Sequence, residues 1–405
     1  MIAMKTTCSD LAIFGGVPAF SDTLYIGRPN IGDSSAFLAK ASEILDRRWL
    51  TNNGACVQEF EARLSSLLGV KHCIVMCNAT IALEITIRAL GMSGEVIVPS
   101  FTFIATPHSL QWQQITPVFC DIDPRTHSID PDRVEELITP RTTGIIGVHV
   151  WGRPCDTGRL EEISRRRNLR LLFDAAHAFS CSHGGRMIGG FGDAEVFSFH
   201  ATKFFNTFEG GAVTTNNDEL ATRIRLMKNF GFSGYDNVIY IGTNGKMSEI
   251  SAAMGLTSLD HLDEFIDVNR SNYQAYSVGL AGLPGVRLFP FEGTDRYNYQ
   301  YVVLEIDPQV AGIGRDTLLK VFHAENIMAR KYFYPGCHRM EPYRSYFPHA
   351  DLLLPETEGL VCRVMLLPTG TAVSGNDVVR ITELLKYVLH NGREITQELQ
   401  NRNLC

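Results

Sequence analysis

A lysine after an apolar run in the middle of the chain is the first residue that suggests covalent chemistry. The run from Ala194 to Phe199 ends in a polar turn that contains Lys203, and Gly210-Gly211 follows. An unprotonated lysine amine is a nucleophile, and a Schiff base with an aldehyde removes the free ammonium. A solvated loop lysine is the common alternative. The aromatic residues around this lysine and the glycine pair favour a packed site instead.

An aspartate ends a second apolar run, Leu169 to Phe173, and offers a carboxylate to the same site. Asp174 could simply be the N-cap of a following helix. It could also pair with a pyridinium nitrogen and keep that ring protonated, so that the ring accepts electrons. His177, one helical turn later, could contact the ring or its phenolate oxygen, although a lone histidine there is more often core packing. A lysine with a buried carboxylate suits pyridoxal 5'-phosphate, which is the predicted cofactor.

Three further places in the sequence could hold the rest of this cofactor. Ala79 and Thr80 follow Asn78 at a predicted helix start, where backbone N–H groups and the helix dipole favour an anion, although Thr80 could be only a cap. Ser198 offers a hydroxyl to the same phosphate. Phe103 could stack on the ring, although an aromatic residue after a strand usually belongs to the core. No Cys/His spacing suggests zinc, so no metal is predicted.

Short apolar strands alternating with helices must position these residues. This alternation predicts an α/β domain with a largely parallel, seven-stranded sheet, which binds ligands beyond the carboxyl ends of its strands. Asp174, Ser198 and Lys203 lie at such ends. The seven predicted strands span residues 72–77, 95–99, 117–121, 144–150, 169–173, 194–199 and 211–215. The predicted helices of this part include residues 34–48, 56–68, 79–90, 131–138, 156–168 and 219–230.

The pattern changes in the last third of the chain. A long predicted helix, residues 248–276, leads out of the sheet domain. Beyond residue 280 the pattern predicts a smaller α+β domain, with strands 285–289 and 299–306 and helices 315–326 and 376–390. We therefore expect a large cofactor-binding domain, residues 1–260, that includes an irregular lead-in at 1–33. The small C-terminal domain is expected to span residues 261–405.

Composition excludes several classes of protein. The 405 residues include 45% hydrophobic and 20% charged residues, which is ordinary for a globular protein. A net charge of −7 without a basic cluster argues against a nucleic-acid partner. No stretch is long and apolar enough for a membrane span, and no secretory signal is visible. The ten cysteines fit buried free thiols better than disulfides. We expect a cytoplasmic protein.

Together these motifs resemble the sugar aminotransferases of the DegT/DnrJ/EryC1/StrS family, which are fold-type-I enzymes that use pyridoxal phosphate. The resemblance covers nearly the whole chain. It implies that Lys203 forms the internal aldimine with the cofactor, that Asp174 holds the ring nitrogen and that Phe103 stacks on the ring. The resemblance is most specific at the segments 173–177, 190–194 and 197–203.

The same resemblance predicts a homodimer with shared active sites. The segment Thr243 to Glu249 matches the family segment whose asparagine reaches the phosphate of the neighbouring subunit. Asn244 would therefore hold a phosphate together with Ala79, Thr80 and Ser198. Two departures stand out: the family usually has glutamine at the position of His177, and a Gly-Tyr-Asn-Tyr-Arg-like run at residues 242–246. Both departures keep hydrogen-bonding capacity, so they indicate a subfamily rather than different chemistry.

Three segments are most similar to the branch of the family that makes dTDP-4-amino-4,6-dideoxyglucose: residues 199–211, 234–242 and 332–338. This similarity implies that L-glutamate donates an amino group to the cofactor. The amine then passes to the C4 ketone of dTDP-4-keto-6-deoxy-D-glucose, and Lys203 is the base that moves protons. Lys331 and Tyr334 are candidate contacts to the sugar nucleotide.

Other activities stay open on the sequence alone. The same chemistry could act on the C3 ketone of a nucleotide sugar or on a cyclitol. A sugar dehydratase on this scaffold carries histidine in place of the lysine. His200 lies close by, but Lys203 occupies the motif position. A cofactor-binding regulator without catalysis is a further alternative, and the set of Lys203, Asp174, Ser198 and Asn244 argues against it.

Overall fold

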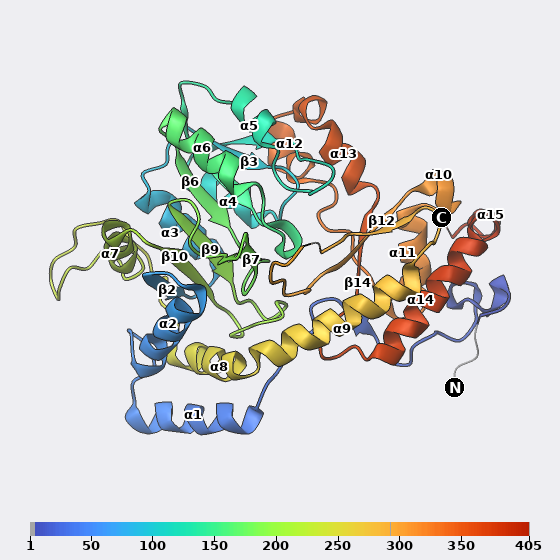
Figure 1. Ribbon diagram of the computed structural model, residues 1–405, viewed down its shortest axis with the longest axis horizontal. Coiled ribbons are helices and arrows are strands. Elements are labelled where there is room, and N and C mark those ends of the chain that lie inside the picture. Colours follow the sequence, from blue (N-terminus) through green and yellow to red (C-terminus); the bar gives the residue numbers. More distant parts are fainter. Residues whose placement is uncertain (1–4, 292, 405) are drawn as a thin grey trace.

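The computed structural model, which describes residues 5–291 and 293–404, is built around one seven-stranded sheet (Figure 1). The strand order is β2-β10-β9-β6-β5-β3-β4. β10 runs antiparallel to β2 and β9, and the other neighbours are parallel. The predicted α/β fold with a mainly parallel sheet is therefore confirmed. The strands are β2 (His72–Met76), β3 (Glu95–Pro99), β4 (Thr116–Cys120), β5 (Thr142–Val148), β6 (Arg170–Asp174), β9 (Ala194–Ser198) and β10 (Gly211–Thr215).

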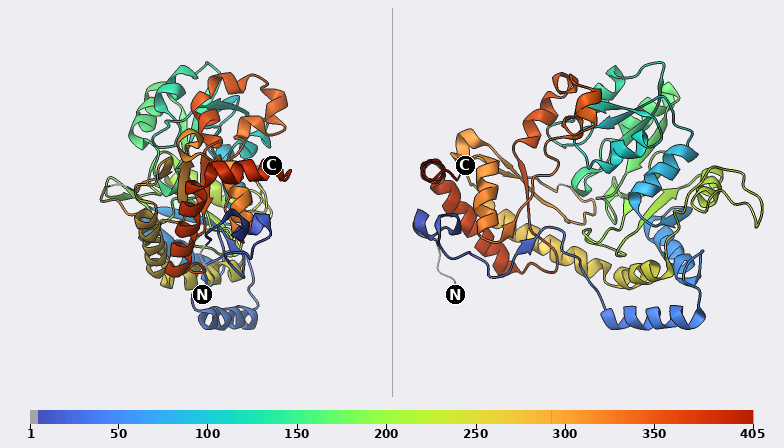
Figure 2. Two further views of the ribbon diagram at one scale, coloured as in Figure 1. Left: turned by 90° about the vertical axis from the view of Figure 1, so that its right-hand side faces the viewer. Right: turned by 180° about the vertical axis from the view of Figure 1, so that it is seen from behind.

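Helices cover both faces of this sheet, because alternate residues of each buried strand enter opposite cores. Phe173 packs in the core shared with α2, α6 and α8, whereas Leu172 packs in the core shared with α3, α4 and α7. The helices are α1 (Ser34–Arg47), α2 (Ala55–Leu68), α3 (Ala79–Ala89), α4 (Ala105–Gln111), α5 (Pro131–Glu136), α6 (Thr157–Arg167), α7 (Asp218–Met227) and α8 (Glu249–Asp260). Figure 2 shows α1 at the lower edge of the molecule, where it packs on α8.

The C-terminal part has its own core around a small antiparallel sheet, which fits the predicted smaller α+β part, although its third strand was not predicted. Its strand order is β11-β12-β14, and α9 and α14 pack against each other (Figure 1). The strands are β11 (Val286–Leu288), β12 (Val302–Ile306) and β14 (Val364–Leu367), and the helices are α9 (Leu262–Leu280), α10 (Pro308–Ala311), α11 (Arg315–Ala324), α12 (Tyr343–Tyr346), α13 (Pro355–Val361), α14 (Gly375–His390) and α15 (Gly392–Asn401). The domain boundary near residue 260 stays a prediction.

The long helix predicted over residues 248–276 is two helices, α8 and α9, that meet at His261. The backbone of His261 leaves the helical region, with φ −111° and ψ 11°. Its ring accepts a hydrogen bond from the N–H of Asp33 at 3.2 Å and pairs with Glu264 at 2.9 Å. α9 is amphipathic, whereas α8 is buried almost all round over residues 252–258, so apolar residues continue up to and beyond the break. The tertiary contacts of His261 mark the break, and local sequence does not.

The lead-in also differs from its predicted place in the large domain. Its described residues begin at Lys5, and Leu11, Phe20 and Leu24 pack in the core of the C-terminal part. The short strand β1 (Leu24–Tyr25) pairs in parallel with β13 (Ile327–Met328). The buried Glu325 carboxylate fixes the segment by accepting hydrogen bonds from the N–H groups of residues 12 and 19 at 2.8 and 2.6 Å.

Within residues 5–291 and 293–404, no helix is long and apolar enough to cross a bilayer. The same residues contain no cluster of His, Cys, Asp or Glu side chains suited to a metal ion. The cysteines of this part are free thiols and most are buried, but Cys362 is exposed, which differs from its predicted burial. Cys405 lies outside the described residues.

Candidate active site

The predicted cofactor residues of the large domain meet at one edge of the sheet. Asp174 ends β6 and Ser198 ends β9, and these strands are parallel neighbours in which Asp174 is paired with Val196. Lys203 lies in the turn between β9 and β10. Because parallel strands end at the same edge, the amine, the carboxylate and the hydroxyl face one region.

The amine of Lys203 is held by a tyrosine and is easily deprotonated. Its Nζ donates a hydrogen bond to the hydroxyl oxygen of Tyr301 at 3.3 Å. Burial lowers the pKa of Lys203 to about 8, although Asp174 and Tyr332 act to raise it. A lysine of this pKa has a neutral, nucleophilic fraction near neutral pH. The position therefore suits a covalent link to an aldehyde.

Asp174 is a buried carboxylate with its own set of donors. Its Oδ2 accepts a hydrogen bond from Thr106 Oγ1 at 2.8 Å, and its Oδ1 accepts one from the N–H of Ala176 at 3.1 Å. Burial raises the pKa of Asp174, whereas these two donors and the charge of Lys203 lower it. A buried carboxylate stabilised in this way is suited to pair with a cationic ring nitrogen.

His177 lies in a stack of aromatic rings next to Lys203. Its ring is nearly parallel to those of Trp151 and Phe333, with centroids 6.1 and 5.8 Å away. Burial, and then the charge of Lys203, lower its pKa well below the ordinary value, so the ring is neutral. Its Nδ1 accepts a hydrogen bond from the N–H of Trp151 at 3.3 Å, which assigns the proton to Nε2. His177 can therefore donate one hydrogen bond.

The start of α3 forms a cradle for an anion beside Ser198. The Asn78 side chain caps the N–H of Ile81 at 2.8 Å and leaves the N–H groups of Ala79 and Thr80 to another acceptor. Gly211 is paired with Ser198, and a Cβ at Gly211 would lie 2.7 Å from the nitrogen of Ala79. Only glycine therefore allows the helix start to approach Ser198 this closely.

Phe103, Lys331 and Tyr334 line one cavity of about 360 Å³ between the large domain and the C-terminal part. Phe103 is 57% exposed, so its ring is free to contact a ligand. Tyr332 and Phe333 line the same cavity, and Phe333 also stacks on His177. The structure therefore connects the predicted substrate residues with the site around Lys203.

Asn244 lies beside the end of β2, where its carbonyl oxygen is 4.0 Å from Sγ of Cys77, the residue before the N-cap of α3. Its neighbour Gly245 accepts a hydrogen bond from the N–H of Cys77 at 2.9 Å, and Lys246 pairs with Met76. This places the segment along the outer side of β2, the edge strand of the sheet. Asn244 itself is exposed. Its contact with the cofactor phosphate of a second subunit stays a prediction.

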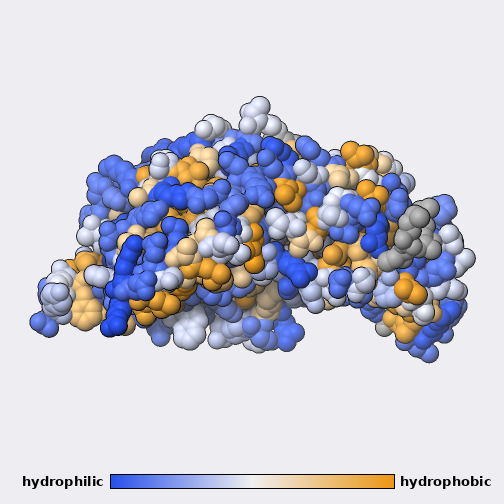
Figure 3. Space-filling model, turned by 90° about the horizontal axis from the view of Figure 1, so that it is seen from below, coloured by the Kyte–Doolittle hydropathy of each residue, from blue (hydrophilic) through white to orange (hydrophobic). Residues whose placement is uncertain are grey.

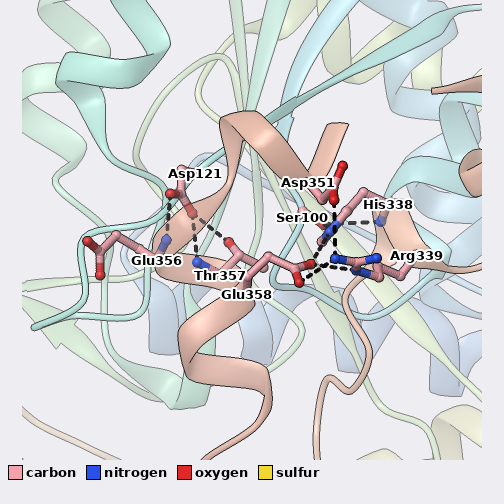
Figure 4. Close-up of polar contacts among 8 residues, drawn as sticks. All are labelled: Ser100, Asp121, His338, Arg339, Asp351, Glu356, Thr357 and Glu358. Atoms are coloured by element: carbon pink, nitrogen blue, oxygen red, sulfur yellow. Dashed lines mark hydrogen bonds and ion pairs between the residues drawn. The ribbon is translucent and has the colours of Figure 1, made fainter. Parts of the chain in front are cut away.

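A polar network fixes the segment that carries Tyr332, Phe333 and Tyr334 against the sheet (Figure 4). His338 Nδ1 lies 2.6 Å from Ser100 Oγ at the end of β3, and its Nε2 lies 2.6 Å from Glu358 Oε1 on α13. Asp121, after β4, caps α13 by accepting from the N–H groups of residues 356 and 357 at 2.9 and 2.8 Å. The Ser100 hydroxyl is fully buried, so this serine, histidine and glutamate set is structural.

Several residues at the site were not predicted from the sequence. The sequence contains only weak signals for these residues, because each of their contacts at the site joins segments far apart in the chain. The alternating tyrosines at 297, 299 and 301 could have indicated the buried start of a strand. Trp151 has a left-handed backbone, with φ 63°, which is uncommon outside glycine and occurs at functional sites. The missed residues are Thr106, Trp151, Tyr301, Tyr332 and Phe333.

Known relatives are similar to nearly the whole chain. The chain is 36% identical over 372 residues to a dTDP-4-amino-4,6-dideoxy-D-glucose transaminase of Shigella dysenteriae, which covers 92% of this chain and 99% of the relative. It is 35% identical over 352 residues to a GDP-perosamine synthase of Caulobacter vibrioides, and the match covers 86% of this chain and 94% of that synthase. A crystal structure of DesI in the presence of its TDP-sugar product superposes with a TM-score of 0.94 at 50% identity. The superposition covers 97% of this chain and 100% of the DesI chain.

The family resemblance predicted from the motifs is confirmed. A model of the DegT/DnrJ/EryC1/StrS aminotransferase family matches residues 33–386, which include every site residue discussed above. The amine of Lys203, the buried carboxylate of Asp174 and the open helix start at Ala79 are groups that pyridoxal phosphate requires at its aldehyde, ring nitrogen and phosphate. The chain therefore belongs to the DegT/DnrJ/EryC1/StrS aminotransferase family, and its cofactor is pyridoxal phosphate.

Proposed function

We propose that the protein transfers the amino group of L-glutamate to the C4 ketone of dTDP-4-keto-6-deoxy-D-glucose, giving dTDP-4-amino-4,6-dideoxy-D-glucose. An aminotransferase activity is supported above all by one observation. The Lys203 amine and the buried Asp174 carboxylate lie together, next to a cavity open to a substrate. The choice of sugar rests on the transaminases of this product, at 36% and 35% identity.

In this proposal each residue has a defined task toward the cofactor. Asp174 holds the ring nitrogen, Ser198 and the N–H groups at the start of α3 hold the phosphate, and Phe103 covers the ring. Bound pyridoxal phosphate supplies an aldehyde for the amine and a ring that takes up electrons. Lys203, once free, accepts and returns protons at Nζ, which its lowered pKa favours. The Nε2–H of neutral His177 is a donor for the ring phenolate oxygen.

The cavity next to this site supports a nucleotide sugar as the acceptor. Its lining combines basic and aromatic side chains, and the Lys331 amine of this lining also pairs with the Asp316 carboxylate at 3.1 Å. Cations complement a diphosphate, and aromatic faces can stack on a base. Lys331 lies over the ring of Tyr334, with Nζ 4.1 Å from the centroid, so the two would act as one surface. The basic and aromatic residues are Phe103, His323, Arg330, Lys331, Tyr332, Phe333 and Tyr334.

A homodimer with shared active sites is part of the proposal. Large apolar side chains are exposed on and after α1 and along residues 230–241, a turn-rich segment after α7 that we call the excursion, and such surfaces usually mark an interface. Figure 3 shows apolar residues among polar ones on the lower face of the molecule, where α1 lies. Asn244 directly follows the excursion and is exposed. The exposed apolar residues are Leu38, Leu45, Trp49, Leu50, Phe230, Tyr235, Val238, Ile239 and Ile241.

Subunit mixing tests the shared site. If Asn244 serves the neighbouring subunit, Lys203→Ala and Asn244→Ala subunits form hybrid dimers with one complete site. Refolding an equal mixture should then restore about a quarter of the wild-type activity, since half of the dimers are hybrids with one good site each. No recovery from the mixture, or a monomer in sedimentation analysis of the active enzyme, would contradict the shared site.

The reaction itself is tested by supplying the purified holoenzyme with L-glutamate and each of two keto-sugars. With dTDP-4-keto-6-deoxy-D-glucose, NMR of the product should place nitrogen on C4, and 2-oxoglutarate should form in equal amount. Amination of the 3-keto isomer in its place would assign a C3 aminotransferase. Turnover of neither sugar, by an enzyme that exchanges its amino group with glutamate, would point to another ketone such as a cyclitol.

A further inference from the structure

We propose that Tyr301 is the positioning partner of Lys203: its hydroxyl holds the free lysine amine beside the reacting carbon while the amine carries a proton. This inference rests on the proposed function, in which Lys203 is released from the cofactor during each half-reaction. Neither the family motifs nor the predicted site includes this tyrosine.

The geometry singles out the hydroxyl group and not the aromatic face. Lys203 Nζ lies 3.3 Å from the Tyr301 hydroxyl oxygen and 5.9 Å from the ring centroid. A distance of 3.3 Å is a hydrogen bond with the amine as donor. Among residues 5–291 and 293–404, Tyr301 is the side chain that hydrogen-bonds to this amine. The tyrosine hydroxyl therefore determines where the free amine rests.

The ring of Tyr301 is itself fixed, so it can act as a support. The residue is 7% exposed. Its ring packs edge-on against His177 and Trp151, with centroids 4.7 and 5.6 Å away. The next residue, Val302, begins β12 and is paired with Leu367 of β14. The two ring contacts and the strand pairing of the next residue leave the hydroxyl little freedom to move away from Lys203.

The charge state of Tyr301 suits a support that leaves the lysine basic. Burial raises the pKa of Tyr301 above its ordinary value, so the phenol stays neutral at physiological pH. A carboxylate in direct contact would hold a proton on the lysine and raise its pKa strongly. A neutral hydroxyl accepts a hydrogen bond from the ammonium and donates one to the amine, so it serves both protonation states.

This arrangement explains how one lysine can both accept and return a proton. Lys203 Nζ accepts the proton of a substrate carbon, so that an N–H bond forms as the carbon–hydrogen bond breaks, and pyridoxal phosphate bound here would supply the electron sink for the pair left on carbon. The ammonium then donates to Tyr301 until the proton is returned from the same nitrogen. Without the hydroxyl, a buried ammonium would lose its partner, and the amine would lose its fixed position.

The test removes the hydroxyl alone. Tyr301→Phe keeps the ring contacts with His177 and Trp151 and should fold. Tyr276→Phe is the matched control, because that buried tyrosine also loses a hydroxyl hydrogen bond, to the Pro368 carbonyl at 2.9 Å, but lies on α9. Apoprotein of each variant is mixed with pyridoxal phosphate, and the rate at which the visible band appears is measured from pH 6 to 10. Amine transfer by the holoenzymes is measured as kcat and KM.

In wild type the capture rate should rise with pH around a midpoint of about 8, because only the neutral amine reacts. In Tyr301→Phe the midpoint should fall by about one pH unit, since the ammonium has lost its acceptor. Its kcat should fall about tenfold with KM unchanged, and Tyr276→Phe should change neither quantity.

An unchanged midpoint and kcat in Tyr301→Phe, an equal effect in Tyr276→Phe, or a change in KM alone would overturn the inference. A wild type that captures the cofactor but aminates no dTDP-sugar would defeat the proposed function. The capture midpoints of the apoproteins would still decide the role of Tyr301 in that case.

Discussion

The site has two walls that differ in how the chain builds them. The wall from the large domain carries Lys203, Asp174 and Ser198 at the ends or in the connecting turn of buried strands. The wall from the C-terminal part carries Tyr301 and the segment 331–334, which is irregular and partly exposed. The sheet sets the position of the large-domain wall. The C-terminal wall depends on long-range contacts such as the Ser100–His338–Glu358 network.

This difference suggests a division of labour. Groups held by the sheet edge suit a cofactor whose geometry is the same in every reaction, and an irregular segment can vary with the substrate. The large-domain wall should therefore control cofactor capture, and the C-terminal wall should control the choice of sugar. Substitutions in the two walls separate these effects.

The largest effect is expected for Lys203→Ala. The variant loses the nucleophile and the proton carrier together, so its transamination rate should fall by at least about 10⁴-fold. Its absorption spectrum with added cofactor should lack the visible band of the wild type. Lys71→Ala, which removes an exposed lysine before β2, should keep the band. A visible band in folded Lys203→Ala would contradict the assignment of this lysine.

Asp174→Asn should have the next largest effect. It keeps the shape of the side chain but leaves the cationic ring nitrogen without its counter-charge in a buried site. Cofactor binding by the apoprotein should weaken by about 10²- to 10³-fold in an equilibrium titration. The exposed Asp218→Asn serves as a control and should bind normally. Equal affinities of Asp174→Asn and wild type would show that this carboxylate does not hold the ring.

Lys331→Ala tests the second wall. The variant removes a cation from the cavity, so KM for the nucleotide sugar should rise about tenfold while the half-reaction with glutamate is unchanged. Lys320→Ala is the control, because it removes the same charge from an exposed position on α11. The amine of Lys320 lies near the Leu404 carbonyl. A slower glutamate half-reaction in Lys331→Ala would remove the proposed separation of the two walls.

Thr106→Val should have the smallest effect. It removes the hydroxyl that donates to Asp174 Oδ2 at 2.8 Å, and cofactor affinity at neutral pH should fall about fivefold. The lost donor lowers the pKa of Asp174 in wild type, so the variant carboxylate should protonate at higher pH, and cofactor affinity should be lost at higher pH on acidification. Thr86→Val removes a buried hydroxyl bonded to its own helix and should leave this pH dependence unchanged.

The large-domain wall was predictable from sequence because local patterns specify it. Apolar runs end at Asp174 and before Lys203, and a sheet that is buried on both faces brings such ends to one edge. The break at His261 was not predictable, because apolar residues continue on both sides of it and contacts with Asp33 and Glu264 mark it. The place of the lead-in was missed for the same reason, since the buried Glu325 that holds it lies far along the chain.

The sequence by itself determined the α/β fold, the family and the residues that meet pyridoxal phosphate, because strand ends and motif spacing are local properties. Only the tertiary structure decided what surrounds them. The neutral state of His177, the lowered pKa of Lys203 and the contact with Tyr301 arise from burial and from chain segments about a hundred residues apart. Burial and long-range contact depend on how all elements pack, and no short stretch of sequence contains that information.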